Sequence, residues 1–254
     1  DIIQCISGLA GTFTERDGKP KMVPSVVADK TAALMAANGL IAAYVKRLRN
    51  GFGSYVECSM FESLASFNLV EHQWGETFSP SKGKAGYERL LSEYRRPHKT
   101  RDGFIAILPY TDKHWEDFWT IVDAVECAND ERFSTMAMRS QHIDVLYEKL
   151  SEFLTSKDTD EWLALLTKAD IPVSRVNLLS ELSSDEHLVR IGFFREFEHP
   201  SEGKLVAPDA GYQFDGASLP VRRPQPRLGE HTHQILSEIG YSEVEILKII
   251  DGEL

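Results

Sequence analysis

The stretch "VPSVVADKTAALMAANGLIAA", residues 23–43, determines how the first part of the chain folds. It places one acidic residue, Asp29, before a long run of small and apolar residues, and this pattern predicts a helix. The helix is expected to reach about Asn50, because basic residues fill its last turn and Gly51 follows as a stop. Its apolar part, Ala32–Val45, is shorter than the roughly 20 residues of a membrane helix and therefore predicts a buried core helix.

Asp29 has two interpretations from the residues alone. An Asp at the start of a helix is among the best caps, because its carboxylate accepts hydrogen bonds from free N–H groups of the first turn. A carboxylate held beside glycine and alanine, where a ligand can come close, is also a candidate nucleophile. The cap is the more common role, and the residues leave both open.

The composition is that of an acidic globular chain. Its 254 residues are 42% hydrophobic, which is enough to bury a core as one large domain or two small ones. The net charge of -11 disfavours a nucleic-acid partner, and no segment predicts a membrane partner. Cys5, Cys58 and Cys127 are scattered, which fits neither a disulfide framework nor a zinc site and favours a reducing cytoplasm.

The first residues read as the inside of a longer protein. Asp1 is not an initiating methionine, and "DIIQCISGLAG" has apolar residues at helical spacing from its start, with no basic region typical of a signal peptide. We expect an upstream part that the sequence does not contain.

The order of elements predicts an α/β fold of two lobes joined by two connectors. We expect a large-lobe segment over residues 1–78, a linker over 79–101, a small α/β domain over 102–212, and a return to the large lobe over 213–254. In the first segment, residues 12–28 are predicted to be a loop, "SYVECS" (54–59) a strand, and the residues after it a second buried helix.

The small lobe and the C-terminal part have clearer patterns. Trp115, Phe118, Trp119 and Val122 fall on one helical face and are predicted to anchor the core. The other expected elements are strands at 103–110 and 172–176, helices at 112–125 and, in two parts, at 139–169, strands within 193–206 around the turn 200–203, and two short C-terminal helices.

No metal or nucleotide motif stands out. His231 and His233 form the only close histidine pair, and a metal site would need further ligands, so a helix-entry pair is the simpler interpretation. The chain has no P-loop, no Gly-x-Gly-x-x-Gly pattern and no nucleophile elbow. The sequence therefore indicates no metal and no tightly bound cofactor.

Two basic clusters interrupt the acidic chain. They fit either a solvated connector or a site for phosphates or carboxylates. Their members are Arg89, Arg95, Arg96, His98, Lys99 and Arg101 in the linker, and Arg222, Arg223 and Arg227 in the proline-rich return.

The chain resembles the family III CoA-transferases over nearly its whole length. The resemblance is carried by "DIIQCISGL" (1–9) and "VVADKTAALMAANGLIAAYVKRLRNGFGSYVECSMFESL" (26–64). Three further stretches follow in the expected order: "YRRPHKTRDGFIAILPY" (94–110), "TDEWLALLTKADIPVSRVNLLSEL" (159–182) and "RRPQPRLGEHTHQIL" (222–236). The family includes formyl-CoA transferase, the carnitine CoA-transferases and the α-methylacyl-CoA racemases.

The resemblance implies covalent CoA transfer between an acyl-CoA and a small carboxylic acid, with Asp29 as the nucleophile. The family's carboxylate attacks the thioester to give a mixed anhydride, and the CoA thiolate then forms an aspartyl-CoA thioester. An aspartate suits this role because such side chains are ionised at neutral pH. CoA would be a substrate, and the CoA-binding residues cannot be named from this sequence.

The resemblance also implies a fold of two interlocked, ring-like chains, that is, a homodimer. The family builds its CoA-binding, Rossmann-like large lobe mostly from a long N-terminal segment that is absent here, so the large lobe is expected to be incomplete. No glycine-rich loop appears between Ser79 and Arg101, and Phe52 stands where the family often has a basic residue. Because the loop is missing, formyl and oxalate specificity is not implied. Phe52 is expected to change only surface contacts.

Two other functions remain open. The racemases of the family use the equivalent Asp with a histidine that would lie upstream of Asp1 as an acid–base pair. Gln4 in "DIIQCISG" is more similar to the transferases and favours transfer. The third possibility is a truncated, non-catalytic chain that dimerises or binds a partner.

Overall fold

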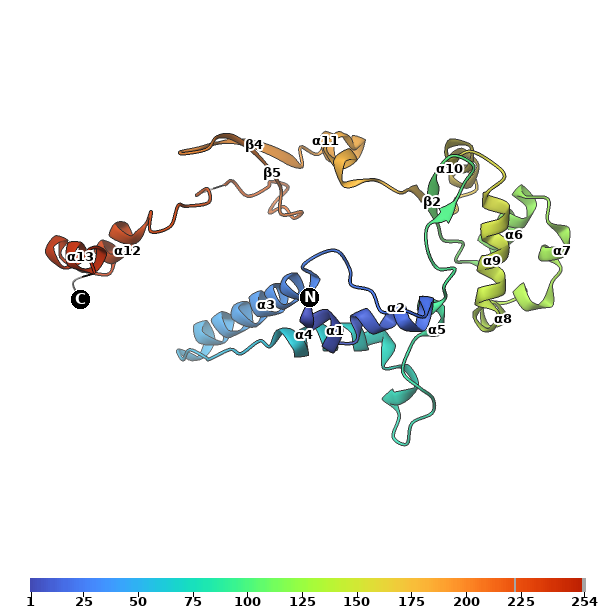
Figure 1. Cartoon of the computed structure of the whole chain (residues 1–254), viewed down its shortest axis with the longest axis horizontal. Coiled ribbons are helices and arrows are strands. Elements are labelled where there is room, and N and C mark those ends of the chain that lie inside the picture. The colour runs from blue at the N-terminus through green and yellow to red at the C-terminus, as the bar shows by residue number, and fades with distance from the viewer. Residues whose placement is uncertain (222, 253–254) are drawn as a thin grey trace. The chain divides into compact units, whose positions relative to one another are not determined.

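The computed structural model describes residues 1–221 and 223–252 and divides into two compact units, Asp1–Val176 and Asn177–Leu254. Helices dominate both units, and the strands form one three-stranded and one two-stranded antiparallel sheet (Figure 1). The α/β prediction is confirmed.

The first unit begins with four helices. They are α1 (Ile2–Ile6), α2 (Leu9–Asp17), α3 (Val27–Asn50) and α4 (Met60–His72). Helix α3 packs along α4, and α1 contacts both of them (Figure 1). The buried side chains gather near the start of α3 and are Gln4, Ser7, Ala10, Ala28, Thr31, Ala32, Leu64 and Asn68.

Three predictions for this region are wrong. Residues 12–17, predicted to be part of a loop, belong to α2, which ends where Gly18 adopts a left-handed conformation at φ 74°. The segment 54–59 is not a strand, because no other strand pairs with it in the described residues. Helix α3 forms, but most of it is not buried: Leu34 is 69% and Leu40 66% exposed.

Helix α4 shows the same difference between apolar composition and burial. The predicted helix is present, and Ser59 caps it by accepting a hydrogen bond from the Glu62 N–H. Leu64 is fully buried, whereas Phe67 and Val70 are exposed. An apolar residue is a candidate for burial, but a covering element must lie over it, and none does so on this face in the described residues.

The chain then passes through short elements into the small α/β part of the same unit. These are η1 (Trp74–Thr77), α5 (Glu88–Leu91), β1 (His98–Lys99) and β2 (Phe104–Ile107). Strand β2 is central: it pairs antiparallel with β1 on one side and with β3 (Val173–Arg175) on the other.

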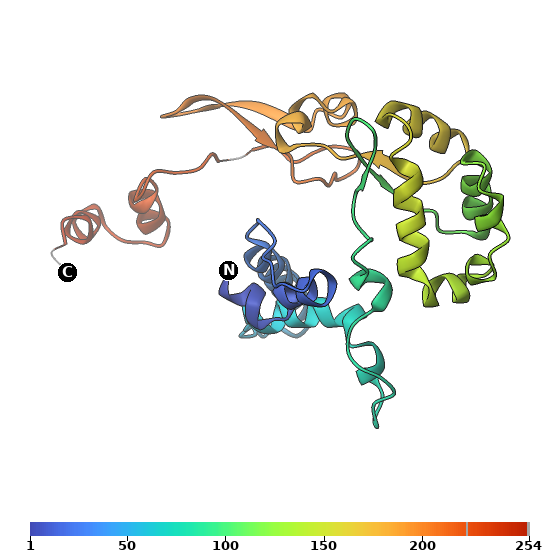
Figure 2. The same cartoon turned by 45° about the vertical axis from the view of Figure 1, so that its right-hand side comes forward.

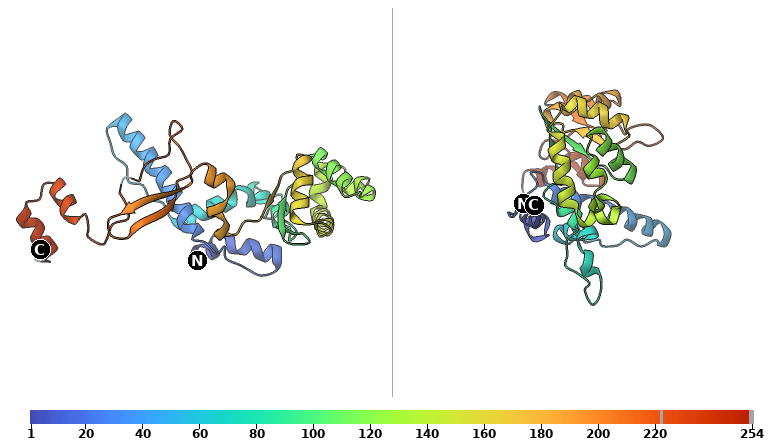
Figure 3. Two further views of the ribbon diagram at one scale, coloured as in Figure 1. Left: turned by 90° about the horizontal axis from the view of Figure 1, so that it is seen from above. Right: turned by 90° about the vertical axis from the view of Figure 1, so that its right-hand side faces the viewer.

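Helices pack beside this sheet. They are α6 (Asp112–Ile121), α7 (Val125–Ala128), η2 (Glu131–Phe133), α8 (Met136–Gln141), α9 (Ile143–Leu154) and α10 (Thr159–Lys168), seen in green to yellow in Figure 3. Helix α9 contacts β1, and α10 contacts β3. Trp115, Phe118 and Trp119 are buried and Val122 packs against them, so the predicted aromatic anchor is confirmed. The predicted helices at 139–169 are also present.

The second unit contains a hairpin and short helices. Its elements are η3 (Leu179–Ser184), α11 (Glu186–Arg190), β4 (Phe194–His199), β5 (Gly203–Pro208), α12 (Thr232–Glu238) and α13 (Glu243–Ile250). Figure 2 shows β4 and β5 as a two-stranded ribbon, which confirms the predicted hairpin. None of the helices in the described ranges has the length and apolarity needed to cross a membrane.

Candidate functional site

Asp29 is the third residue of α3 and does not cap it. The helix begins at Val27, the cap position is Val26, and no side chain makes a capping hydrogen bond. The cap interpretation is therefore wrong. Asp29 is exposed, and within the described residues its carboxylate has neither a hydrogen-bond donor nor an ion-pair partner. Its negative charge still suits the first turn of a helix, where the dipole is positive.

The segment before α3 explains why the helix starts two residues before Asp29. The Ser25 N–H donates to the Val23 carbonyl at 2.7 Å, which closes a tight turn around Pro24. The first helical hydrogen bond then runs from the Lys30 N–H to the Val26 carbonyl at 3.1 Å. The Ser25 hydroxyl accepts a hydrogen bond from the Lys30 ammonium at 3.0 Å, and Ser25 lies one residue before the cap position, Val26.

The Gln4 side chain holds this turn in place by hydrogen bonds. It lies on α1, is 1% exposed, and donates from Nε2 to the carbonyls of Val23 and Ser25, both at 3.1 Å. Its Oε1 accepts the Val23 N–H at 2.9 Å. From the sequence, Gln4 was interpreted only as a residue that makes the chain more similar to the transferases. A single amide among Ile2, Ile3 and Ile6 was the signal of a buried polar role.

A second buried amide ties α4 to α1. Asn68 donates from Nδ2 to the Ser7 carbonyl at 3.1 Å, and the Ser7 hydroxyl donates to the Gln4 carbonyl at 3.4 Å. On α3, Ala28 and Ala32 pack into the same buried region. The start of α3, with Asp29 on its exposed side, is thus the best-packed part of the four-helix region.

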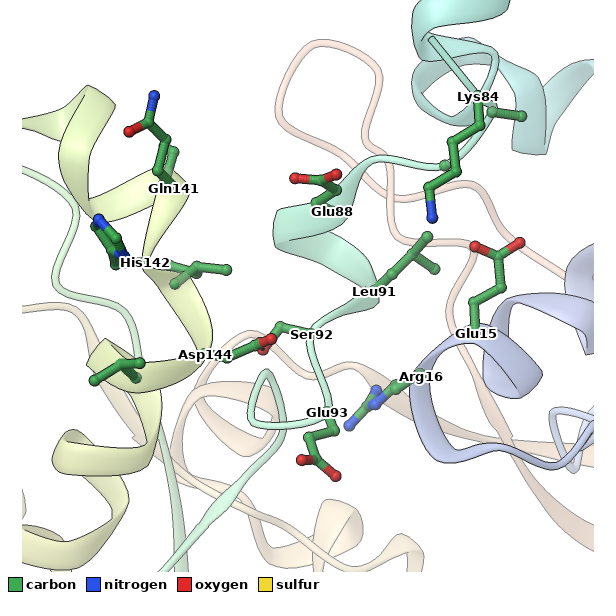
Figure 4. A pocket seen from close by; sticks show the side chains of 15 residues that line it. Glu15, Arg16, Lys84, Glu88, Leu91, Ser92, Glu93, Gln141, His142 and Asp144 are labelled. Carbon is green, nitrogen blue, oxygen red and sulfur yellow. Dashed lines mark hydrogen bonds between the residues drawn. The ribbon is translucent and has the colours of Figure 1, made fainter.

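A crevice of the first unit lies elsewhere. It has a volume of about 530 Å³ and is lined by α2, by residues 84–93 and by residues 140–145 (Figure 4). Lys84 points toward Glu15, and the Ser92 hydroxyl donates to Asp144 at 2.5 Å. Asp29 is not among its lining residues. The wall carries the carboxylates of Glu15, Glu88, Glu93 and Asp144 against two basic side chains, so it does not favour a polyanionic ligand.

The basic residues of the linker do not act as one cluster. Arg101 is used in ion pairs with α10, at 2.6 Å to Asp158 and 3.2 Å to Glu161. The Arg89 guanidinium lies over the ring of Tyr110, 5.1 Å from its centroid. These two arginines have structural partners within the unit.

Arg96 also lies over an aromatic ring, that of Tyr94, 5.9 Å from its centroid, and it shares an open surface with Arg95. Both border an open crevice whose floor includes Ala106, Leu108 and Val173 on the sheet. Neighbouring His98 is buried, and this burial, followed by the charge of Arg96, lowers the pKa of His98 to about 4. His98 is therefore neutral at neutral pH and adds no positive charge.

The other predicted candidates lie in the second unit. Arg223 and Arg227 are there, and Arg222 falls outside the described residues. His231 occupies the position before α12, and His233 Nε2 lies 2.9 Å from the Glu243 carboxylate of α13, so the pair belongs to a helix–helix contact. Across residues 1–221 and 223–252, no group of three or more potential metal ligands comes together.

Residues 1–232 match the family model described as CoA-transferase family III. The chain belongs to CoA-transferase family III. The resemblance drawn from the sequence motifs is confirmed.

Curated proteins named as CoA-transferases align with nearly all of this chain. Mouse succinyl-CoA:glutarate CoA-transferase is 25% identical over 257 residues, which cover 98% of this chain and 57% of the mouse protein. Formyl-CoA:oxalate CoA-transferase from Escherichia coli is 27% identical over 274 residues, covering 97% of this chain and 64% of that enzyme. The chain thus spans somewhat more than half the length of these relatives.

Two solved structures share the fold of this chain. Rv3272 from M. tuberculosis superposes with a TM-score of 0.73 at 20% identity, over 91% of this chain and 61% of that protein. A CAIB/BAIF family protein from Brucella suis gives a TM-score of 0.70 at 22% identity, over 93% and 61% of the two chains.

Proposed function

We infer that this chain takes part in the transfer of CoA from an acyl-CoA to a small carboxylic acid, with Asp29 as the nucleophile. The main support is the position of Asp29: its carboxylate is exposed and, within the described residues, unpaired, in the first turn of a helix whose start is held by the buried amide of Gln4. Family membership and relatives named as CoA-transferases support the reaction class.

The proposed reaction is balanced without an external base. A carboxylate oxygen of Asp29 attacks the thioester carbonyl, the C–S bond breaks, and a mixed anhydride and the CoA thiolate form. The thiolate attacks the aspartyl carbonyl of the anhydride, which gives an aspartyl-CoA thioester and releases the donor acid. The acceptor carboxylate then passes through the same two steps in reverse and leaves as its CoA thioester.

The surroundings of Asp29 suit these steps. The first N–H groups of α3 have no intrahelical acceptor and no capping side chain. Such donors, together with the positive end of the helix dipole, stabilise an oxyanion that forms beside them. Since aspartate is already charged at neutral pH, no neighbouring histidine is needed to activate it.

The remaining parts of the proposal follow the family resemblance. We propose a homodimer in the cytoplasm with CoA as substrate and no tightly bound cofactor. The acceptors named for the two curated relatives, glutarate and oxalate, are both dicarboxylic acids, so small dicarboxylates are the first acceptors to test.

The racemase alternative uses the same carboxylate as an acid–base group. It requires a second titratable group, the histidine that the family resemblance places upstream of Asp1. A non-catalytic binding chain remains the third outcome. The three functions differ in whether CoA moves, an α-proton exchanges, or neither occurs.

Isotope exchange tests the proposal. The protein is incubated with succinyl-CoA and ¹³C-labelled glutarate, and label in the CoA ester is followed by mass spectrometry, with parallel double-reciprocal plots expected for a covalent intermediate. Asp29→Asn should abolish transfer. Glu62→Gln is the matched control, because Glu62 is also an exposed carboxylate at the third position of a helix, α4. Deuterium uptake at the α-carbon without CoA transfer would support the racemase instead.

A further inference from the structure

Gln4 uses its whole amide on one short segment. Both hydrogens of Nε2 are donated, one to the Val23 carbonyl and one to the Ser25 carbonyl, and Oε1 accepts the Val23 N–H. The reversed amide would place donors against the Val23 N–H, so the hydrogen bonds fix its orientation. A buried amide is costly unless it is bonded in this way.

The segment that Gln4 holds is the entrance to α3. Val23 and Ser25 flank Pro24, whose ring fixes its own backbone angle. The chain is therefore held on both sides of a stiff residue, and Val26 then accepts the first helical hydrogen bond. Asp29 lies four residues after Ser25, in the first turn of α3. A shift of residues 23–25 would therefore also shift the Asp29 carboxylate.

The body of α3 has separate anchors. Ala28 and Ala32 are buried by packing, and the Thr31 hydroxyl donates to the Val27 carbonyl within the helix. Asn68 joins α4 to α1 without touching residues 23–25. Loss of the Gln4 amide should therefore loosen the entrance of the helix while leaving its packing in place.

We propose that Gln4 is a positioning residue for Asp29: its buried amide fixes the turn at 23–25 and thereby the place of the carboxylate relative to the thioester. This inference rests on the proposed function. A displacement of about 1 Å from the reactive geometry is enough to slow a reaction about 100-fold, so a residue remote from the reacting atoms can govern the rate.

We call the three hydrogen bonds that the Gln4 amide makes with Val23 and Ser25 the clamp, and two substitutions test it. Gln4→Glu keeps the size of the side chain but replaces two donors with a carboxylate facing the carbonyls of Val23 and Ser25. Gln4→Met keeps most of the volume and removes every hydrogen bond. Leu150→Val is the control, because it thins the packing of a fully buried α9 side chain in a core cluster that contains none of residues 1–32.

The test combines hydrogen exchange with kinetics. The Val23 N–H is donated to Gln4, so amide exchange in a peptide covering residues 19–30 reports the clamp without requiring activity. Both Gln4 variants should exchange faster there and lower kcat about 10- to 100-fold, with KM for the acyl-CoA changed less than about 3-fold. Leu150→Val should lower the melting temperature but change neither readout.

Each result has one meaning. Unchanged exchange in the Gln4 variants would overturn the clamp, and faster exchange with unchanged kcat would overturn its positioning role. An Asp29→Asn protein that still transfers CoA would overturn the proposed function, whatever the exchange data show.

Discussion

The buried histidine of the small α/β part, His98, should make this unit sensitive to mild acid. His98 is 4% exposed, and its Nδ1 lies 2.7 Å from the Ser151 hydroxyl on α9. That hydroxyl donates its single hydrogen to the Tyr147 carbonyl at 2.8 Å, so His98 Nδ1 must carry the proton that joins the two side chains. Burial, and secondarily the charge of Arg96, lowers the pKa of His98 to about 4.

The direction of the effect follows from the two states. Above pH 6.5 the imidazole is mainly neutral in both the folded and the unfolded state, so His98 contributes no pH dependence to the free energy of unfolding there. As the pH falls from 6.5 toward 4, the unfolded chain binds a proton that the folded chain excludes, so the free energy of unfolding decreases. At about 1.4 kcal/mol per pKa unit, the loss is about 2 kcal/mol at pH 5 and about 3 kcal/mol below pH 4.

Urea unfolding at pH 7.5 and pH 5 measures this loss. Tryptophan fluorescence follows the unit, because Trp115, Trp119 and Trp162 all lie in its core. His98→Asn is the comparison, since its amide can donate to Ser151 from nearly the position of Nδ1 and does not titrate. The wild type should lose about 2 kcal/mol more than the variant between the two pH values. Equal losses would refute a neutral, buried His98.

Three other substitutions test the packing and the turns. Leu150→Ala, at a fully buried position of α9, should lower the unfolding free energy by about 2–5 kcal/mol in urea, whereas a loss below about 1 kcal/mol would contradict a close-packed core. The Asp102 carboxylate accepts the Thr159 N–H at 2.8 Å, and this bond lowers the pKa of Asp102. The bond therefore stabilises the folded state above pH 3.8, and this stabilisation is lost as the pH falls through the folded pKa. Asp102→Asn should therefore flatten the acid end of the stability profile, and an unaltered profile would exclude this bond. Gly75→Ala would place a Cβ 2.6 Å from the Gly83 backbone, so thermal melting should show a lower Tm, and an unchanged Tm would mean that the backbones at Gly75 and Gly83 lie farther apart.

Local patterns predicted the parts of the chain whose partners are close in sequence. The aromatic face of Trp115, Phe118 and Trp119, the helices that follow it and the hairpin around 200–203 carry their own periodicity and turn residues, and all are present. The two hairpin strands pair with each other, and α6 contacts α7, the next helix along the chain. The sequence thus contained both the element and the reason for its burial.

The errors arose where the decisive contact is distant. Apolar residues along α3 predicted burial, but composition does not say what covers a helix, and Leu34 and Leu40 are exposed. The start of α3 was placed at Asp29 because Asp is a good cap, whereas the turn held by Gln4 lets the helix begin at Val27. No local pattern reveals a hydrogen bond across 19 residues.

The proposed covalent role of Asp29 is most directly tested by trapping the acyl or CoA adduct. The protein is mixed with succinyl-CoA, quenched with hydroxylamine and digested, and the peptide that contains Asp29 is sequenced by mass spectrometry. We expect an aspartyl hydroxamate at Asp29 that requires succinyl-CoA and is absent from Asp29→Asn. A hydroxamate at another carboxylate, or CoA transfer with Asp29 unmodified under the same conditions, would contradict it.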